Sequence, residues 1–75
     1  MARSVYTVEY KMHPTDAVQF VDVLARTKEN AYDQAYYGDI PYKHNGAYAY
    51  SAWVASVTYQ NGNCKRFNTF EGKPY

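Results

Sequence analysis

Hydrophobic and polar residues alternate strictly over residues 4–12, near the start of the chain. One side carries Tyr6, Val8, Tyr10 and Met12, and the other carries Val5, Thr7, Glu9 and Lys11. A period of two, with aromatic and β-branched residues, is typical of a strand that has one buried face. The sequence His13-Pro14-Thr15-Asp16 predicts the end of this strand, because proline has no amide donor and restricts the residue before it.

Residues 17–38 admit two interpretations. In the first, a strand over residues 18–25 precedes a helix over residues 28–37. Thr27 is then the N-cap, Glu29 lies in the first turn, and Gly38 ends the helix. The buried stripe of this helix consists of Ala31, Tyr32, Ala35 and Tyr36.

The second interpretation is one long helix from about residue 15 to residue 37. Its support is a set of residues that recur with a period of about 3.6. These residues are Ala17, Phe20, Val21, Leu24, Lys28, Ala31, Tyr32 and Ala35. Three valines lie between residues 18 and 23, and β-branched residues favour a strand. Thr27, followed by charged residues, also resembles a new helix start, so the strand-then-helix interpretation is preferred.

Residues 38–49 are predicted to form a loop, which is long for a compact domain. Four tyrosines lie in it or beside it: Tyr36, Tyr37, Tyr42 and Tyr48. Long loops in small domains are often functional. This segment is therefore the first place where contacts with another molecule are expected.

A β-hairpin is predicted at Asn61-Gly62, with strands over residues 50–60 and 63–70, because this dipeptide suits a two-residue type I′ turn. Such a turn pairs Tyr59 with Cys64, Val57 with Arg66, Ala55 with Asn68 and Trp53 with Phe70. The core face then carries Trp53, Val57, Tyr59 and Phe70, and the other face carries Ser56, Thr58, Lys65 and Phe67. Residues 71–75 are expected to be irregular and to lie against the body or a partner.

Together these elements predict a single domain over residues 1–75 of the α+β class. Its expected architecture is an antiparallel sheet of three to four strands with one helix packed on one face. The expected order of elements is ββαββ, and βαββ is the alternative. A chain of this size buries only about 60–65% of the surface that its unfolded form exposes, so its core must be small.

Ten of the 75 residues are tyrosine, and the chain is 19% aromatic. A small core cannot enclose all of these rings, so some are expected at the surface. Exposed tyrosine offers a large apolar ring with a polar tip, which suits contact surfaces. The core candidates are Tyr6, Tyr10, Tyr32 and Tyr59. The candidates for a protein-binding surface are Tyr37, Tyr42, Tyr48 and Tyr75.

The formal net charge is only +1. Nucleic-acid-binding domains usually carry a clear basic excess, because phosphate contacts supply much of their affinity. A protein is therefore the expected partner. The alternative is a binder of single-stranded nucleic acid, in which Lys65, Arg66 and Phe67 form an aromatic and basic strand face. The same residues are also typical of an edge strand whose charges prevent aggregation.

Catalytic candidates are few. A nucleophile would need Cys64 or a serine beside His13 or His44, with an acid to orient the base. Cys64 falls within the hairpin, where a small apolar side chain is expected, and both histidines fall in turns. The single cysteine cannot form an internal disulfide, and no Cys/His grouping has the spacing of a zinc site. The sequence therefore predicts no enzymatic activity, no cofactor and no metal.

The cellular location is predicted from what the sequence lacks and from its one cysteine. No apolar run is long enough for a transmembrane helix. Residues 1–6 lead into a strand pattern rather than a signal peptide. A single free cysteine favours a reducing interior, so we expect the protein in the cytoplasm and not in a membrane.

The chain resembles the small accessory proteins of bacteriophages and mobile elements, among them the anti-CRISPR proteins. The resemblance covers the strand over residues 6–12, the helix start Thr27-Lys28-Glu29-Asn30-Ala31-Tyr32 and the hairpin at Asn61-Gly62, and it is to a class rather than to a sequence family. It implies an inhibitor of a bacterial defence complex, acting in the cytoplasm of the host. DNA-mimicking anti-CRISPR proteins are usually strongly acidic and this chain is not, so occlusion of a protein surface or forced association is expected.

Self-association is a separate expectation. The hairpin leaves one strand without a partner, and an unpaired strand edge is a template for another chain. Surplus aromatic surface adds apolar area that a second copy would cover. The sequence therefore predicts a homo-oligomer in which two copies pair across a two-fold axis.

Overall fold

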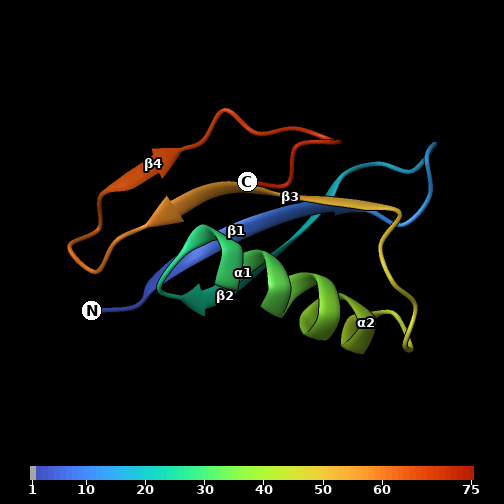
Figure 1. Cartoon of the computed structure of the whole chain (residues 1–75), viewed down its shortest axis with the longest axis horizontal. Helices are drawn as coiled ribbons and strands as arrows, with labels where there is room; N and C mark the ends of the chain where they lie inside the picture. The colour runs from blue at the N-terminus through green and yellow to red at the C-terminus, as the bar shows by residue number, and fades with distance from the viewer. Residues whose placement is uncertain (1) are drawn as a thin grey trace.

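The computed structural model describes residues 2–75, which form one antiparallel sheet with a helical segment on one face (Figure 1). The strands are β1 (Ser4–Lys11), β2 (Gln19–Ala25), β3 (Ser51–Thr58) and β4 (Cys64–Arg66), in the sheet order β2-β1-β3-β4. The helical segment consists of α1 (Lys28–Gln34), a π-helical turn η1 (Ala35–Asp39) and α2 (Ile40–Lys43). The predicted α+β class and the order ββαββ are confirmed. The strand-then-helix interpretation of residues 17–38 is also confirmed.

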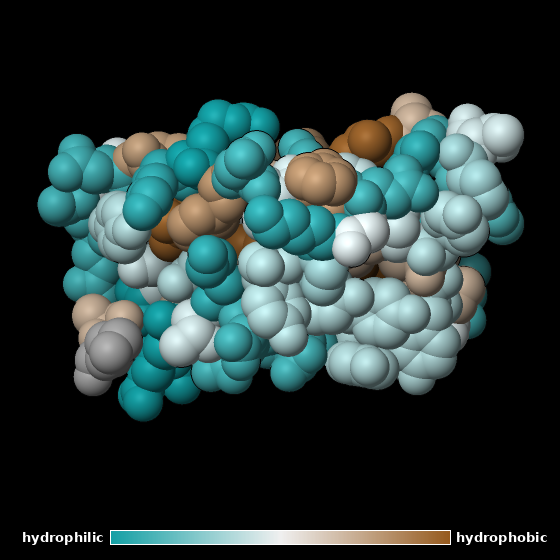
Figure 2. Space-filling view, turned by 45° about the horizontal axis from the view of Figure 1, so that its top comes forward, coloured by the Kyte–Doolittle hydropathy of each residue, from teal (hydrophilic) through white to brown (hydrophobic). Residues whose placement is uncertain are grey.

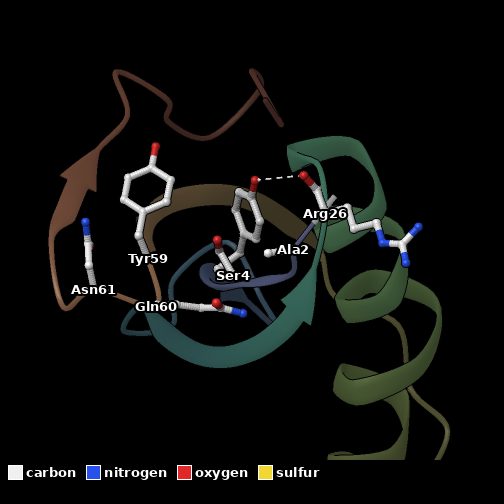
Figure 3. Close-up of a pocket in the computed structure, with 7 residues that line it drawn as sticks. Ala2, Ser4, Arg26, Tyr59, Gln60 and Asn61 are labelled. Carbon is white, nitrogen blue, oxygen red and sulfur yellow. Dashed lines mark hydrogen bonds between the residues drawn. The ribbon is translucent and has the colours of Figure 1, made fainter.

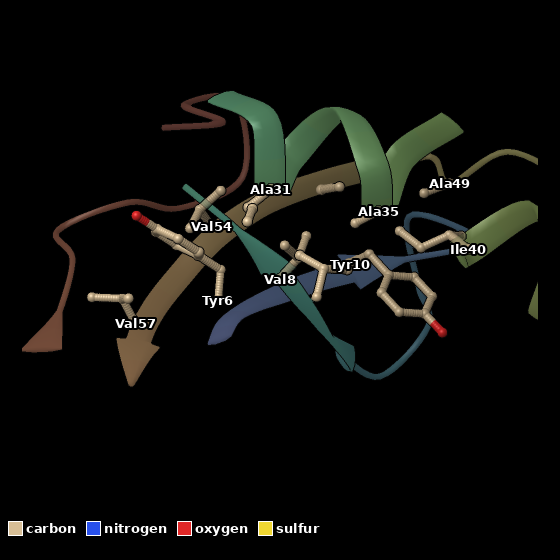
Figure 4. Packing of buried hydrophobic residues seen from close by; sticks show 12 residues of the cluster. Tyr6, Val8, Tyr10, Ala31, Ala35, Ile40, Ala49, Val54 and Val57 are labelled. Carbon is tan, nitrogen blue, oxygen red and sulfur yellow. The ribbon is translucent and has the colours of Figure 1, made fainter. Parts of the chain in front are cut away.

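The core lies between the sheet and the helical segment (Figure 4). Alternation along β1 directs Tyr6, Val8 and Tyr10 into it, and Val8 and Tyr10 are fully buried. Two of the helix residues that face them are alanines, whose small side chains let the helix lie close to the sheet. The fully buried residues of the helical segment are Ala31, Ala35 and Ile40.

The helical segment begins where the sequence predicts and ends later. The Asn30 amide donates to Oγ1 of Thr27 at 3.1 Å, so Thr27 is the N-cap. Gly38 lies inside the π turn, and the helical segment continues to Lys43. The predictions that Gly38 ends the helix and that residues 38–43 belong to a loop are therefore wrong.

The π turn explains why both predictions fail. Ala31 and Ala35 are four residues apart, but the next buried residue, Ile40, follows by five. The Ile40 amide donates to the Ala35 carbonyl, five residues back. A regular helix would place Asp39 inward, whereas the wider turn places Ile40 there. Pro41 then follows the π turn directly, in the first turn of α2.

A β-bulge in β3 sends two predicted core residues to opposite faces. Val57 lies opposite Tyr6 and Trp53 lies opposite Glu9, so four steps along β3 match three along β1. Glu9 points away from the core, and Trp53 Nε1 donates to Glu9 Oε1 at 2.9 Å. The prediction that Trp53 and Val57 share a face is wrong, because the extra residue of a bulge reverses the alternation.

The hairpin is present, but its pairing differs from the prediction by one residue. Thr58 pairs with Cys64, so Tyr59 lies outside the ladder. The Gly62 amide donates to the Tyr59 carbonyl at 3.0 Å, and Gly62 has a φ of 89°. Asn61 has no positive φ, which the predicted type I′ turn required. This three-residue loop matches a type I turn followed by a glycine bulge.

The chain after β4 runs back along β3 (Figure 1). The Phe67 amide donates to the Ala55 carbonyl at 2.9 Å, and the Val54 amide donates to the Pro74 carbonyl at 2.8 Å. Residues 71–75 therefore lie against the body of the protein, one of the two predicted places. This path brings the ring of Tyr75 to the first turns of the helical segment.

Candidate functional site

Most of the ten tyrosines are exposed. Tyr6 and Tyr10 lie in the core as predicted, whereas Tyr59, also predicted to be buried, is 43% exposed because it lies beyond the last β3–β4 pair. Tyr32 and Tyr36 are partly buried and pack against the core. The exposed residues are Tyr37, Tyr42, Tyr48, Tyr50, Tyr59 and Tyr75, which confirms that the small core leaves many rings outside.

Five tyrosines contact one another in one cluster, here called the tyrosine face: Tyr32, Tyr36, Tyr37, Tyr48 and Tyr75. The Tyr36 ring stacks against Tyr32 and Tyr48, with centroid distances of 5.5 and 5.8 Å. Tyr37 lies edge-on to Tyr36 at 4.9 Å and to Tyr48 at 6.3 Å. Tyr75 lies 5.8 Å from Tyr32 at the other end. Contacts of this kind are attractive, so each ring helps to hold its neighbours.

Three separate parts of the chain build the tyrosine face. Tyr32 and Tyr36 are four residues apart on the helical segment, so their rings lie on the same side. Successive residues of a regular helix point about 100° apart, and the wider π turn reduces this angle, which lets Tyr37 contact Tyr36. Tyr48 comes from the connection before β3, and Tyr75 comes from the segment that follows β4.

Much of the tyrosine face is open to solvent. Tyr37, Tyr48 and Tyr75 are 65%, 60% and 46% exposed. In Figure 2, side chains of intermediate hydropathy, the class to which tyrosine belongs, form a broad pale field on the side where the helical segment ends. Brown, strongly apolar side chains appear only in small separate patches. Such a surface tolerates water in the free protein and still offers large rings for contact.

The structure brings together three of the four predicted protein-binding residues, namely Tyr37, Tyr48 and Tyr75. Tyr42 is 91% exposed but lies on α2, outside the contacts of the tyrosine face. Tyr32 was predicted only to be buried, whereas Tyr36 was predicted both in the buried stripe and among the tyrosines beside the loop where contacts were expected. Their rings also form the centre of the face, and the sequence signal for this is their spacing of four, followed at once by Tyr37.

The surroundings of Tyr32 in the tyrosine face favour its uncharged phenol. Burial raises the pKa of the Tyr32 phenol above the ordinary value of 10.0. The charges that Tyr36, Tyr37, Asp33 and Tyr75 carry when ionised raise this pKa further. At neutral pH the Tyr32 hydroxyl is therefore protonated and can both donate and accept a hydrogen bond.

Stability is expected to fall in alkali. Tyr6, Tyr10 and Tyr32 each have a pKa above 10.0 in the folded protein, with burial as the main cause. Below about pH 10 these phenols are neutral in both states and contribute no pH dependence. Above that pH the unfolded chain releases its protons first, so the free energy of unfolding decreases as pH rises. Urea denaturation at a series of pH values should show a plateau and then this decline, and a plateau that extends well above pH 10 would contradict it.

Of the three residues predicted for nucleic-acid binding, Lys65 and Phe67 lie on one face as expected, with Lys65 Nζ 6.0 Å from the centroid of the Phe67 ring. Lys65 lies opposite Val57, on the Tyr6 side of the sheet, whereas Arg66 alternates to the other side. Phe67 is partly buried and stacks on Tyr6, with ring centroids 6.4 Å apart. Less of the Phe67 ring is therefore free for a nucleotide base. Binding of single-stranded nucleic acid stays a prediction, and an oligonucleotide titration at low salt tests it.

The candidate catalytic residues lie apart. Cys64 is exposed on β4, contrary to the packed position expected for it. His13 is exposed in the turn after β1. His44 Nε2 lies 2.8 Å from Tyr10 Oη, which also lies 3.3 Å from Gln19 Oε1. Both contacts are satisfied when Tyr10 donates to Gln19 and accepts from His44, so His44 ties the end of the helical segment to the sheet. Within residues 2–75 no three His, Cys, Asp or Glu side chains are grouped so as to hold a metal ion.

A hollow of about 460 Å³ lies at the start of β1 (Figure 3). Tyr6 Oη donates to the Arg26 carbonyl at 3.4 Å. The Arg26 guanidinium points away from Tyr59 and the hollow, so this cation is not directed into it. The lining residues are Ala2, Ser4, Tyr6, Arg26, Tyr59, Gln60 and Asn61. They supply hydrogen-bonding groups but no acid–base pair.

Comparison with known proteins gives no match, whether the chain is compared with family models, with curated proteins or with solved structures. No helix within residues 2–75 combines the length and the apolar character needed to span a bilayer. Function is therefore inferred from the geometry of the residues of this chain.

Proposed function

We propose that this protein is a non-enzymatic protein-binding module and that the tyrosine face is its contact surface. The observation that carries the proposal is the mutual contact of five rings, of which Tyr37, Tyr48 and Tyr75 remain substantially exposed. Rings that neighbours already hold lose little freedom when a partner binds, so less of the contact free energy is lost to ordering. Tyrosine is also among the residues that dominate binding energy at protein interfaces.

The charge of the chain supports a protein rather than a nucleic acid as the partner. A net charge of +1 provides neither the basic excess that phosphate groups require nor the acidic excess of a DNA mimic. We infer a phage-type inhibitor of a bacterial defence complex that covers a surface of that complex. It would act in the cytoplasm of the bacterial host, without a cofactor, as a stoichiometric inhibitor.

Capture of a partner tests the tyrosine face. A tagged Tyr37→Ala/Tyr48→Ala variant is expected to retain at most about one tenth of the partner that the unchanged chain captures from bacterial lysate, since removal of central aromatic anchors typically costs about 2 kcal/mol or more. The matched control is the Tyr50→Ala/Tyr59→Ala variant, which removes two exposed tyrosines outside the face. Capture is measured by quantitative mass spectrometry.

Equal capture by both double variants and the unchanged chain would contradict the assignment of this surface. An equal loss of capture in both double variants would show that binding depends on the number of exposed tyrosines rather than on the tyrosine face. The inhibitor proposal has its own assay, in which the chain is produced in bacteria with an active defence system and phage plating is counted. Plating should rise with the unchanged chain and with the Tyr50→Ala/Tyr59→Ala control, but not with the Tyr37→Ala/Tyr48→Ala variant.

Self-association is the remaining part of the proposal. The exposed rings of the tyrosine face offer aromatic area that a second copy would cover. Light scattering over a concentration series measures this directly. If the protein stays monomeric at high concentration, self-association is ruled out, and the partner of the tyrosine face is a different protein.

A further inference from the structure

The two edges of the sheet differ in how well they are protected. β4 is only three residues long and carries Lys65 and Arg66, which are typical of an edge that resists pairing with other chains. β2 is seven residues long, pairs only with β1 within residues 2–75, and contains no lysine, arginine or proline. Its side chains of Phe20 and Leu24 are 62% and 52% exposed. β2 is therefore a free edge that another extended chain can join.

A hollow of about 470 Å³ lies along this free edge. Three consecutive β2 residues, Phe20, Val21 and Asp22, line it together with residues of the helical segment. Successive side chains of a strand point to opposite faces, so three in a row line one hollow only where the hollow lies at the edge of the strand. The remaining lining residues are Asp39, Tyr42 and Lys43.

The chemistry of the hollow favours a cation. Asp22 and Asp39 supply two carboxylates against the single positive charge of Lys43, and Asp22 Oδ1 also accepts a hydrogen bond from Thr7 Oγ1 at 2.7 Å. Among residues 2–75, the one ion pair joins Lys11 to Glu71. Neither Asp22 nor Asp39 therefore forms an ion pair with a basic side chain there. Phe20 and Tyr42 add two largely exposed rings, whose faces attract positive charge.

A second copy of this chain fits the edge poorly. The middle residue of β2 is Asp22, and a two-fold pairing centred there would place two aspartates directly opposite each other. Like charges in opposite positions destabilise a strand pair. We propose instead that the edge of β2 and its hollow form a second binding site, which takes an extended peptide segment that carries a lysine or arginine.

In this site the peptide backbone pairs with β2, and the peptide becomes a fifth strand of the sheet. Alternate side chains of the peptide then point to opposite faces. A cationic side chain that points toward the helical segment lies against Asp39 and the Tyr42 ring. Side chains that point to the other face lie against Phe20, Asp22 and Leu24, which share the outer face of β2. The site shares no residue with the tyrosine face, so an experiment can contradict one of the two proposals and leave the other intact.

Fluorescence anisotropy with labelled peptides tests the proposal. The probe is a peptide of about ten residues in which lysine alternates with valine, the length of chain needed to cover a strand. The first control peptide has glutamate in place of lysine, and the second has alternate backbone amides methylated, which removes the donors needed for strand pairing. Each control peptide is expected to bind at least about tenfold more weakly than the probe.

Protein variants locate the contact. Tyr42→Ala and Asp39→Asn change exposed residues, so circular dichroism should show an unchanged fold. Each variant is expected to bind the lysine probe at least about fivefold more weakly. The Tyr37→Ala/Tyr48→Ala variant is the matched control and should bind the probe as the unchanged chain does.

Three results would overturn the proposal. The first is the absence of any anisotropy change with the lysine probe. The second is equal binding of the methylated peptide, which would mean charge attraction without strand pairing. The third is a dimer, seen by sedimentation, that the Phe20→Lys variant dissociates, because the β2 edge would then belong to a second copy.

Discussion

The Tyr10→Ala variant is expected to lose about 3–5 kcal/mol of unfolding free energy, the usual cost of deleting a buried aromatic side chain. Tyr10 is fully buried and lies beneath the end of the helical segment, where it contacts His44 edge-on at 5.5 Å. A domain of this length has a total stability of roughly 4–11 kcal/mol, so the variant should be largely unfolded at the lower end of that range. Urea denaturation followed by circular dichroism measures the loss.

The Tyr10→Phe variant separates the hydroxyl group from the ring. It keeps the packing but leaves Gln19 Oε1 and His44 Nε2 without their shared partner. A cost of about 1–3 kcal/mol is expected, because two hydrogen bonds are lost and each typically contributes about 0.5–1.5 kcal/mol. A loss below about 1 kcal/mol for Tyr10→Ala itself would mean that β1 does not carry the core described above.

Local signals in the sequence predicted much of the fold. Strict alternation in β1 identified Tyr6, Val8 and Tyr10 as inward, because a strand with one buried face leaves few other arrangements. Thr27 identified the helix start, since its hydroxyl satisfies a free amide within three residues. These predictions succeeded because each depends on residues close together in the chain.

The errors have a common physical origin. The π turn and the β3 bulge each insert one residue into a regular element, and each changes which side chain points inward. Ile40 replaces Asp39 in the core, and Trp53 moves to the face opposite Val57. No local pattern specifies such an insertion. It is decided by which side chains fill the space between the helix and the sheet.

The candidate site was predicted in part for the same reason. Composition alone indicates that ten tyrosines exceed what a small core encloses, and Tyr37, Tyr48 and Tyr75 are exposed as predicted. Their contact with one another depends on three segments that are distant in the sequence. It could not be predicted without knowing the path of the chain after β4. Tyr42 is exposed too, but the end of α2 places it beside the β2 edge rather than on the tyrosine face.

The Ile40→Ala variant is expected to lose about 3 kcal/mol of unfolding free energy, within the range for buried aliphatic side chains. Ile40 is fully buried and belongs to the cluster between the sheet and the helical segment. Truncation leaves a cavity where the π turn ends, next to alanines that are too small to fill it. Urea denaturation measures the change in stability.

Asp39→Ala is the matched control, because a helix without the π turn would place residue 39 inward in place of Ile40. Asp39 is exposed, so its replacement is expected to change the unfolding free energy by no more than about 0.5 kcal/mol. The difference between the two variants therefore reports the phase of the helix. The reverse result, with the larger loss at position 39, would mean that the helix has no extra residue in this turn. The arrangement of Tyr36 and Tyr37 in the tyrosine face would then be wrong as well.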